Sequence, residues 1–259
     1  IITVAANIQL KYGWPIMPPE ALAKATSVSN AIAGVTHVAP NMRQPYVGQS
    51  AFAHKAGLHA SAIKVDANLY QHTDPQLVGN DMRMLVSDMA GRANIQLKGD
   101  ELGYDVSDRE VAARVTDKVK AREMEGYSYE STDASFELLL RDELGIPADF
   151  FEVVAWRVLT GHEAKPEGDS EAVVKLTANG VTSSFVGEGQ GPVNALDVAL
   201  RSALAPHHPV VTSFELTDYR VRILETGHGT DAIVRVLIDT TDGERTWTTV
   251  GVGSNVIEA

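Results

Sequence analysis

Apolar residues recur at helical spacing through the first 147 positions of the chain. Ile1, Val4, Ala5 and Ile8 share one face of a helix over 1–12. The same spacing predicts helices over 20–35, 107–125 and 131–144, and Ser107 with Glu110 fits a capping box for the helix at 107–125. A short extended piece is expected at 82–86. The N-terminal part is therefore predicted to be largely helical.

From position 150 the pattern changes to strands rich in β-branched and aromatic residues. Asn179-Gly180 and Asp242-Gly243 are strong hairpin signals between pairs of these strands. Pro192 favours the start of one helix, which continues to about residue 204. The strands are expected at 150–160, 171–179, 181–189, 210–226, 231–240 and 244–253.

The strand-rich part contains an internal repeat. Residues 186–195 (VGEGQGPVNA) align without a gap on residues 250–259 (VGVGSNVIEA). Two βββα units are implied, with the second helix missing beyond Ala259. Two copies of one such unit usually pack as layers of sheet and helix. The predicted fold class is α+β, with helical hinge subdomains followed by a regulatory domain of two pseudo-repeated βββα units.

Both ends of the chain suggest a segment of a longer polypeptide, because it opens within a helical pattern and stops as a helix begins. Four parts are predicted. Residues 1–48 are read as the end of an upstream domain with a linker helix, 49–80 as a segment that covers a site, 81–147 as a helical subdomain and 148–259 as the regulatory domain.

The segment 52–79 holds the candidate chemistry. It carries three of the eight histidines, His54, His59 and His72, together with Tyr70 and many small residues that let another surface approach closely. Short helical turns joined by loops are expected here. This composition is typical of a segment that lies over a site.

Three histidines invite a zinc interpretation, but their spacings of five and thirteen do not match the helical i, i+4 pair, and the chain has no cysteine. No metal ligand is predicted. General acid–base or substrate-positioning chemistry is more consistent with an imidazole near pH 7. Solvated or capping histidines are the alternative that the sequence leaves open.

The glycine-rich turn GEGQGP at 187–192 leads into a helix but matches neither a dinucleotide nor a nucleotide phosphate motif. A tight strand-to-helix turn is the favoured interpretation. The helix start also offers free N–H groups that could bind a carboxylate.

The net charge, the length of the apolar runs and the cysteine content exclude several classes of partner and site. With 34 acidic and 22 basic residues the net charge is −12, which disfavours duplex nucleic acid and anionic membranes as partners. No apolar run reaches the roughly 20 residues of a membrane span. The lack of cysteine excludes disulfides, and a reducing cytoplasm is the expected location.

The motifs FAHKAGLHASAI, LYQHTDPQLVGN and LVSDMAGRANI resemble the central region of the 2-isopropylmalate, homocitrate and citramalate synthase family. The resemblance extends over essentially all of 1–259. Citramalate synthases are the more similar branch, since Ala60-Ser61 stands where isopropylmalate synthases tend to carry Gln-Asp. In this family a (β/α)₈ barrel binds a divalent metal and condenses acetyl-CoA with a 2-oxo acid. The resemblance implies that the barrel, with its metal and general base, lies upstream of Ile1.

Residue roles follow from that resemblance alone. It implies that His59 and Tyr70 are catalytic in the active site of the partner subunit of a homodimer, with His54 and His72 as substrate-binding or supporting residues. It also implies an amino-acid effector, isoleucine for citramalate synthases, in the regulatory domain. The effector-binding candidates are Gly191, Val193, Asn194, Tyr219 and Val221.

Two hypotheses of different class remain. The chain is the hinge and allosteric portion of a citramalate synthase-like acyltransferase, or of a 2-isopropylmalate or homocitrate synthase. In isolation it is only an effector-binding and dimerisation module without turnover.

Overall fold

The computed structural model describes residues 1–259 except 39, 88–89, 148–149, 162–169 and 225–231. The chain forms two compact units, Ile1–Ala121 and Arg122–Ala259. Each is described by itself below. The described part is α+β, with helices and small sheets. The finer division into four parts stays a prediction.

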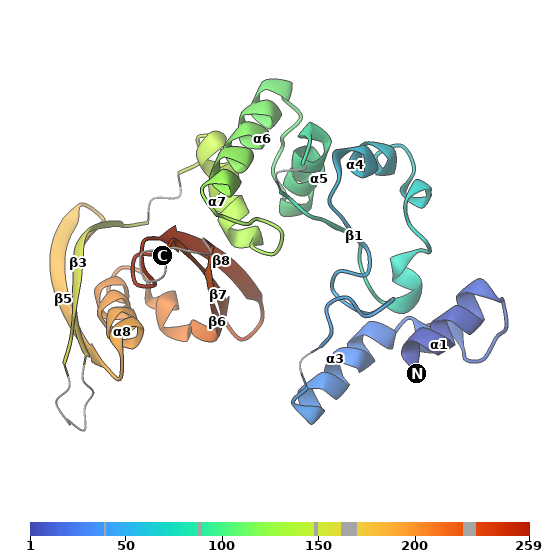
Figure 1. Ribbon diagram of the computed structural model, residues 1–259, viewed down its shortest axis with the longest axis horizontal. Coiled ribbons are helices and arrows are strands. Elements are labelled where there is room, and N and C mark those ends of the chain that lie inside the picture. Colours follow the sequence, from blue (N-terminus) through green and yellow to red (C-terminus); the bar gives the residue numbers. More distant parts are fainter. Residues whose placement is uncertain (39, 88–89, 148–149, 162–169, 225–231) are drawn as a thin grey trace. The chain divides into compact units, whose positions relative to one another are not determined.

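The first unit is mainly helical, as the apolar spacing predicts (Figure 1). Two very short strands pair in parallel, so that Ala53 lies opposite Arg83 and His54 opposite Met84. Strand β2 falls in the expected extended piece at 82–86, whereas β1 was not predicted. The elements are α1 Ile2–Ala6, the π-helical turn η1 Asn7–Lys11, α2 Pro19–Leu22, α3 Ala25–Thr36, β1 Ala53–His54, α4 Gly57–Ile63, the 3₁₀ turns η2 Ala67–Leu69 and η3 Pro75–Val78, β2 Arg83–Met84 and α5 Arg92–Leu102.

Two apolar clusters hold this unit together. One joins α1, α2 and the segment after α3, and the other packs α4 against β2. Burial of each large apolar side chain contributes about 1.5–3 kcal/mol. The buried members are Ala6, Leu22, Ala25, Tyr46, Val47, Phe52 and Val78 in the first cluster, and Ala60, Ile63 and Met84 in the second.

Helix α6, Arg109–Met124, begins in the first unit and ends in the second. Its start corrects the predicted capping box. Oδ1 of Asp108 accepts the N–H of Glu110 at 2.7 Å, so Asp108 caps the helix. Ser107 instead donates its own N–H to Asp105 at 2.9 Å. The sequence offered two capping side chains in succession, and the second is the one used.

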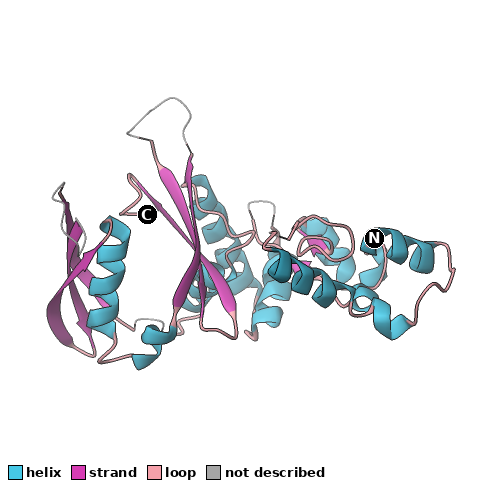
Figure 2. Cartoon of the chain, turned by 90° about the horizontal axis from the view of Figure 1, so that it is seen from below, coloured by secondary structure: helices cyan, strands magenta, loops and turns pink. Residues whose placement is uncertain are grey.

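The second unit contains two three-stranded antiparallel sheets, with strand orders β3-β4-β5 and β6-β7-β8 (Figures 1 and 2). Helix α8 lies between them in the chain and against β4 and β5 in space. The elements are α7 Asp133–Glu143, β3 Glu152–Thr160, β4 Ser170–Ala178, β5 Val181–Gly189, α8 Pro192–Leu204, the 3₁₀ turn η4 Pro209–Ser213, β6 Glu215–Ile223, β7 Val234–Thr241 and β8 Thr246–Gly253.

The hairpin predictions are confirmed at both turns. Asn179 and Gly180 both have positive φ, 49° and 76°, as a two-residue type I′ turn between β4 and β5 requires. Gly243, with φ of 91°, serves the turn between β7 and β8. The strand expected over 210–226 is shorter, because Pro209–Ser213 forms a 3₁₀ turn. Its residues 225–226, and residue 231 of the next expected strand, lie outside the described residues.

Glycines allow α8 to approach β5. A Cβ on Gly187 would collide with the carbonyl oxygen of Ala195 and lie 2.5 Å from the nitrogen of Ala199. A Cβ on Gly189 would lie 2.6 Å from the nitrogen of Ala195. The interpretation of GEGQGP as a tight strand-to-helix connection is therefore confirmed. The core between α8 and the sheet is correspondingly built mainly from small residues, with buried Ala172, Val174, Leu176 and Ala178 on β4 and Ala195, Ala199, Ala203 and Leu204 on α8.

Candidate functional site

The histidine-bearing segment folds as the sequence predicts, in short helical turns joined by loops. Each 3₁₀ turn begins at an aspartate. Asp66 accepts the N–H of Asn68 at 2.9 Å, and Asp74 accepts the N–H of Gln76 at 3.0 Å. These local caps fix the backbone between α4 and β2, and they bring side chains on either side of each turn together.

His59 and Tyr70 come into direct contact. Their rings stack with centroids 4.0 Å apart and planes inclined by 28°. His59 is half-buried on α4, while Tyr70 follows η2 and is 40% exposed. The pair thus presents an imidazole and a phenolic hydroxyl, both able to donate a hydrogen bond, at an exposed edge of the unit.

His54 is buried next to His59. Its ring meets the ring of His59 edge to face at 6.0 Å, and its side chain is only 8% exposed. Its Nε2 is buried without a hydrogen-bond partner among the described residues. Burial lowers the pKa of His54, and the nearby His59 and His72 lower it further. His54 is therefore a neutral imidazole near pH 7.

His72 is the third histidine of the segment and lies close enough to His54 to affect its pKa. Its ring stacks on Phe52 at 4.8 Å and meets Tyr46 edge to face at 5.4 Å. Burial lowers the pKa of His72, and the cation of Lys11 lowers it further. Nζ of Lys11 donates to the backbone carbonyl of His72. The hydroxyl of Tyr46 donates to Oδ1 of Asn7 at 3.0 Å.

The structure therefore brings together all four residues that the segment offered. It adds Phe52, Tyr46 and Lys11, which the sequence reading did not select. Phe52 opens the histidine motif and could have been included for that reason. Lys11 and Tyr46 lie outside the motif, and only the tertiary fold places them beside His72.

Among the residues that the structure describes, no group of three or more His, Asp or Glu side chains is placed to hold a metal ion. The rings of His54, His59 and His72 contact other aromatic rings, and an imidazole can donate a hydrogen bond or transfer a proton. None of the described helices is long and apolar enough to cross a membrane.

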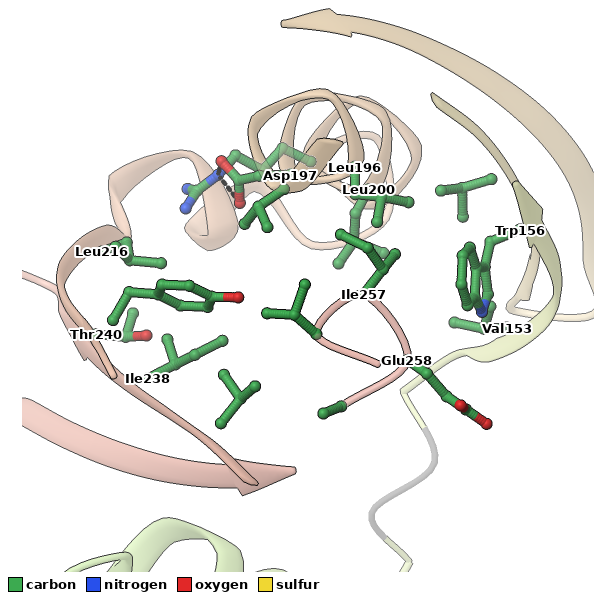
Figure 3. Close-up of a pocket in the computed structure, with 17 residues that line it drawn as sticks. Val153, Trp156, Leu196, Asp197, Leu200, Leu216, Ile238, Thr240, Ile257 and Glu258 are labelled. Carbon is green, nitrogen blue, oxygen red and sulfur yellow. Dashed lines mark hydrogen bonds and ion pairs between the residues drawn. The ribbon is translucent and has the colours of Figure 1, made fainter. Parts of the chain in front are cut away.

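A second candidate site lies in the other unit. An apolar cavity of about 380 Å³ opens between α8 and one face of the β6-β7-β8 sheet. Figure 3 shows Trp156 at one end, Thr240 at the other, and Leu196 and Ile257 between them. The residues that line it are Val153, Trp156, Val174, Val193, Leu196, Asp197, Leu200, Arg201, Leu216, Tyr219, Val236, Ile238, Thr240, Val256, Ile257, Glu258 and Ala259.

The charged groups in the cavity wall are paired. Asp197 and Arg201 form an ion pair at 2.8 Å (Figure 3). Nη1 of Arg201 also donates to the carbonyls of Val211 and Phe214 at 2.7 and 2.6 Å. The hydroxyl of Tyr219 is buried without a partner among the described residues, and burial raises its pKa. It is the polar atom best placed to meet a ligand.

Two of the five predicted effector residues, Val193 and Tyr219, line this cavity. Gly191 is the N-cap residue of α8, and Oδ1 of Asn194 accepts the N–H of Gln190 at 3.1 Å, within the turn itself. Val221 lies two residues beyond Tyr219 and is outside the lining. Trp156, Leu196 and Ile238 were missed, because nothing in their local sequence distinguishes a cavity wall from a packed core.

Two family models match the chain. One, described as the homocitrate synthase post-HMGL domain-like family, matches residues 46–126. The other, described as the LeuA allosteric (dimerisation) domain, matches residues 130–259, slightly more than half of the chain. The chain belongs to the LeuA allosteric (dimerisation) domain family. The LeuA domain contains the apolar cavity, and the other matched region contains His54, His59, Tyr70 and His72.

The whole chain is similar to curated (R)-citramalate synthases. The protein from Streptomyces coelicolor is 57% identical over 263 residues, that from Aquifex aeolicus 44% over 264, and that from Synechocystis sp. 42% over 264. Each alignment covers 100% of this chain and 49%, 49% and 48% of the relative, respectively. The chain therefore spans about half the length of the curated relatives it matches and corresponds to their C-terminal half.

Proposed function

We propose that this chain is the hinge and regulatory portion of a citramalate synthase-like acyltransferase. The full-length enzyme would condense acetyl-CoA with pyruvate, in isoleucine biosynthesis, as a cytoplasmic homodimer. The observation that carries this proposal is the whole-length similarity to (R)-citramalate synthases at up to 57% identity. The metal and the general base would reside in the remainder of the full-length protein.

The His59–Tyr70 pair would act on the reacting oxygens. A Claisen-type condensation removes a methyl proton from acetyl-CoA and develops negative charge on the thioester and oxo-acid oxygens. A protonated imidazole or a phenolic hydroxyl can donate to these oxygens. The stacked geometry at 4.0 Å and the exposure of Tyr70 support this role. His54 and His72 would bind substrate or hold the pair in place.

Kinetics of the full-length enzyme test this role. His59→Ala and Tyr70→Phe should each lower kcat, by about 10²–10⁴-fold for loss of a general acid or base. Tyr12→Phe is the matched control, because Tyr12 is an exposed tyrosine of the same unit outside the cluster. Unchanged kcat in both cluster variants would remove the cluster from the mechanism.

Strand-to-helix contacts support a duplicated unit in the LeuA domain. A Cβ on Gly187 would collide with the carbonyl oxygen of Ala195, and a Cβ on Gly251 would collide with that of Ala259. The two glycines, and the two alanines, occupy equivalent positions in the sequence repeat.

The turns of the repeat also share a hydrogen bond. The N–H of Gln190 donates to Oδ1 of Asn194 at 3.1 Å, and the N–H of Ser254 donates to Oε2 of Glu258 at 3.1 Å. We infer from these matched contacts that each sheet belongs to one βββα unit.

The LeuA domain would bind an amino-acid end product as a feedback effector, with isoleucine the first candidate. The apolar cavity suits a branched aliphatic side chain, and Val193 and Tyr219 would contact it. Gly191, Asn194 and Val221 remain proposed contributors through the helix start and β6. Titration calorimetry with isoleucine, leucine and lysine is the direct test. Heat with isoleucine alone is expected, and no heat with any of the three would reject the effector role.

The alternative enzymes are 2-isopropylmalate synthase and homocitrate synthase, the second favoured by the match at residues 46–126. Assaying the full-length enzyme with pyruvate, 2-oxoisovalerate and 2-oxoglutarate separates them. In isolation the 259 residues would be a binding and dimerisation module, so condensation of acetyl-CoA with pyruvate by this chain alone would contradict the proposal.

A further inference from the structure

Strand β7 lines the cavity with one face and contacts the end of α6 with the other. Val236, Ile238 and Thr240 line the cavity, and successive side chains of a strand point to opposite faces of the sheet. Arg235, between Val234 and Val236, therefore points away from the cavity. β7 is also the central strand of its sheet, hydrogen-bonded to β6 on one side and β8 on the other.

On that far face, Arg235 holds the end of α6. Its Nε donates to the carbonyl of Gly126, and its Nη2 donates to the carbonyl of Tyr127 at 3.2 Å. Both carbonyls directly follow the last turn of α6, where Gly126 takes a positive φ of 108°. A guanidinium that binds two carbonyls in a fork holds them in a fixed geometry.

The residues around Gly126 are closely packed. A Cβ on Gly126 would collide with Cδ1 of Leu224 and lie 3.5 Å from Cγ1 of Val252. The N–H of Val250 in β8 donates to Oγ of Ser135 in α7 at 2.9 Å. The end of α6 and the start of α7 are thus attached to the same sheet whose other face lines the cavity.

Charges around Arg235 are mixed. Burial lowers its pKa and Arg222 lowers it further, whereas Glu123 and Glu130 raise it. Arg222 lies directly opposite Arg235 in the β6–β7 register and is exposed. Of these two arginines, only Arg235 reaches the carbonyls after α6.

We propose that Arg235 couples the cavity to α6, so that a ligand against Val236 and Ile238 changes the position of β7 and, through Arg235, the end of that helix. α6 begins at Arg109, in the unit that contains His59 and Tyr70. Arg235 can act in this way only if the cavity binds the effector, so the proposal rests on the proposed function. It adds the residue through which binding alters turnover.

The test uses the full-length enzyme with Arg235→Met, which keeps the length of the side chain and removes every donor. Effector affinity is measured by calorimetry, and inhibition of turnover is measured at saturating isoleucine. Arg235→Met should bind isoleucine like the wild type and keep kcat in its absence, but lose inhibition. Coupling between allosteric sites is about 5- to 150-fold, so the loss is measurable.

Arg222→Met is the matched control, because it removes the neighbouring guanidinium from the same face. It should retain both binding and inhibition. Arg235→Lys keeps the charge but cannot hold both carbonyls in a fork, and it should lose part of the inhibition. If Arg235→Met does not fold, Arg235→Lys provides the test of whether Arg235 is needed for inhibition.

Hydrogen exchange gives an independent readout. Isoleucine should change amide exchange in 119–127 of the wild type, and this change should vanish in the Arg235 variant that folds. Full inhibition in that variant, with the wild-type exchange response, overturns the role of Arg235. A wild-type enzyme that binds none of isoleucine, leucine and lysine would instead reject the effector site itself, and the coupling with it.

Discussion

The buried imidazole of His54 makes the stability of the first unit depend on pH. Its folded-state pKa lies below the ordinary value of 6.5, so the unfolded chain takes up its proton first as pH falls. The contribution of His54 is therefore present above pH 6.5 and lost as pH falls through the folded-state pKa. His72 acts in the same direction.

We expect the free energy of unfolding of the 259-residue chain to fall between pH 7.5 and pH 5.5, and to fall less in His54→Phe. Phenylalanine keeps the apolar packing against His59 and has no proton to bind. Urea denaturation at the two pH values measures both differences. An equal loss in the variant would show that His54 does not contribute.

At this scale the structure places the four candidate residues near one another, while their roles stay predictions. His54, His59, Tyr70 and His72 were selected by residue type and the small residues around them. The stacking of His59 on Tyr70 depends on the turn that Asp66 begins, and the contact between Lys11 and His72 depends on the tertiary fold. No periodicity encodes such long-range contacts.

Among the elements, the close contact of β5 with α8 has a direct stability test. Gly187→Ala would place a methyl group against backbone atoms of Ala195 and Ala199, which cannot move without distorting α8. Overpacking of this kind costs about 1–3 kcal/mol. The variant should therefore lower the free energy of unfolding by that amount, as measured by chemical denaturation.

Gly34→Ala is the matched control, because Gly34 lies exposed within α3 with open space around its Cα. Alanine is favoured over glycine in a helix by about 0.5–1 kcal/mol, so this variant should be stabilised. Destabilisation of both variants by similar amounts would contradict the packing argument at Gly187.

The helices and long strands were predictable because each repeats a local pattern over many residues. α6, α7, α8 and the hairpins at Asn179 and Asp242 follow from spacing and turn chemistry. Strand β2 falls in the extended piece predicted at 82–86, but β1 was not predicted, because so short a strand exists only through its pairing with β2. The cap of α6 was misassigned by one residue, as helix starts often are.

At the scale of the whole molecule, the proposed homodimer makes a prediction that a single subunit cannot. If His59 and Tyr70 of one subunit serve the barrel of the other, a mixed dimer can keep one intact active site. Full-length subunits carrying His59→Ala, mixed with subunits that have an inactive barrel, should regain up to about half of the wild-type activity per active dimer.

Subunit exchange followed by an activity assay measures this recovery, and each variant mixed with itself provides the baseline. No recovery in dimers shown to be mixed would mean that the cluster serves its own barrel or none. Such intersubunit sites cannot be derived from one chain, since the sequence of a segment does not say whose site it covers.

The bare backbone at Gly187 also has a genetic consequence. Every missense change at its codon adds a Cβ, and the structure has no room there for even one carbon. The position thus has no conservative neighbour in the genetic code. In a library of random single-codon changes selected for growth, the codon for Gly187 should accept fewer amino acids than the codon for Gly34.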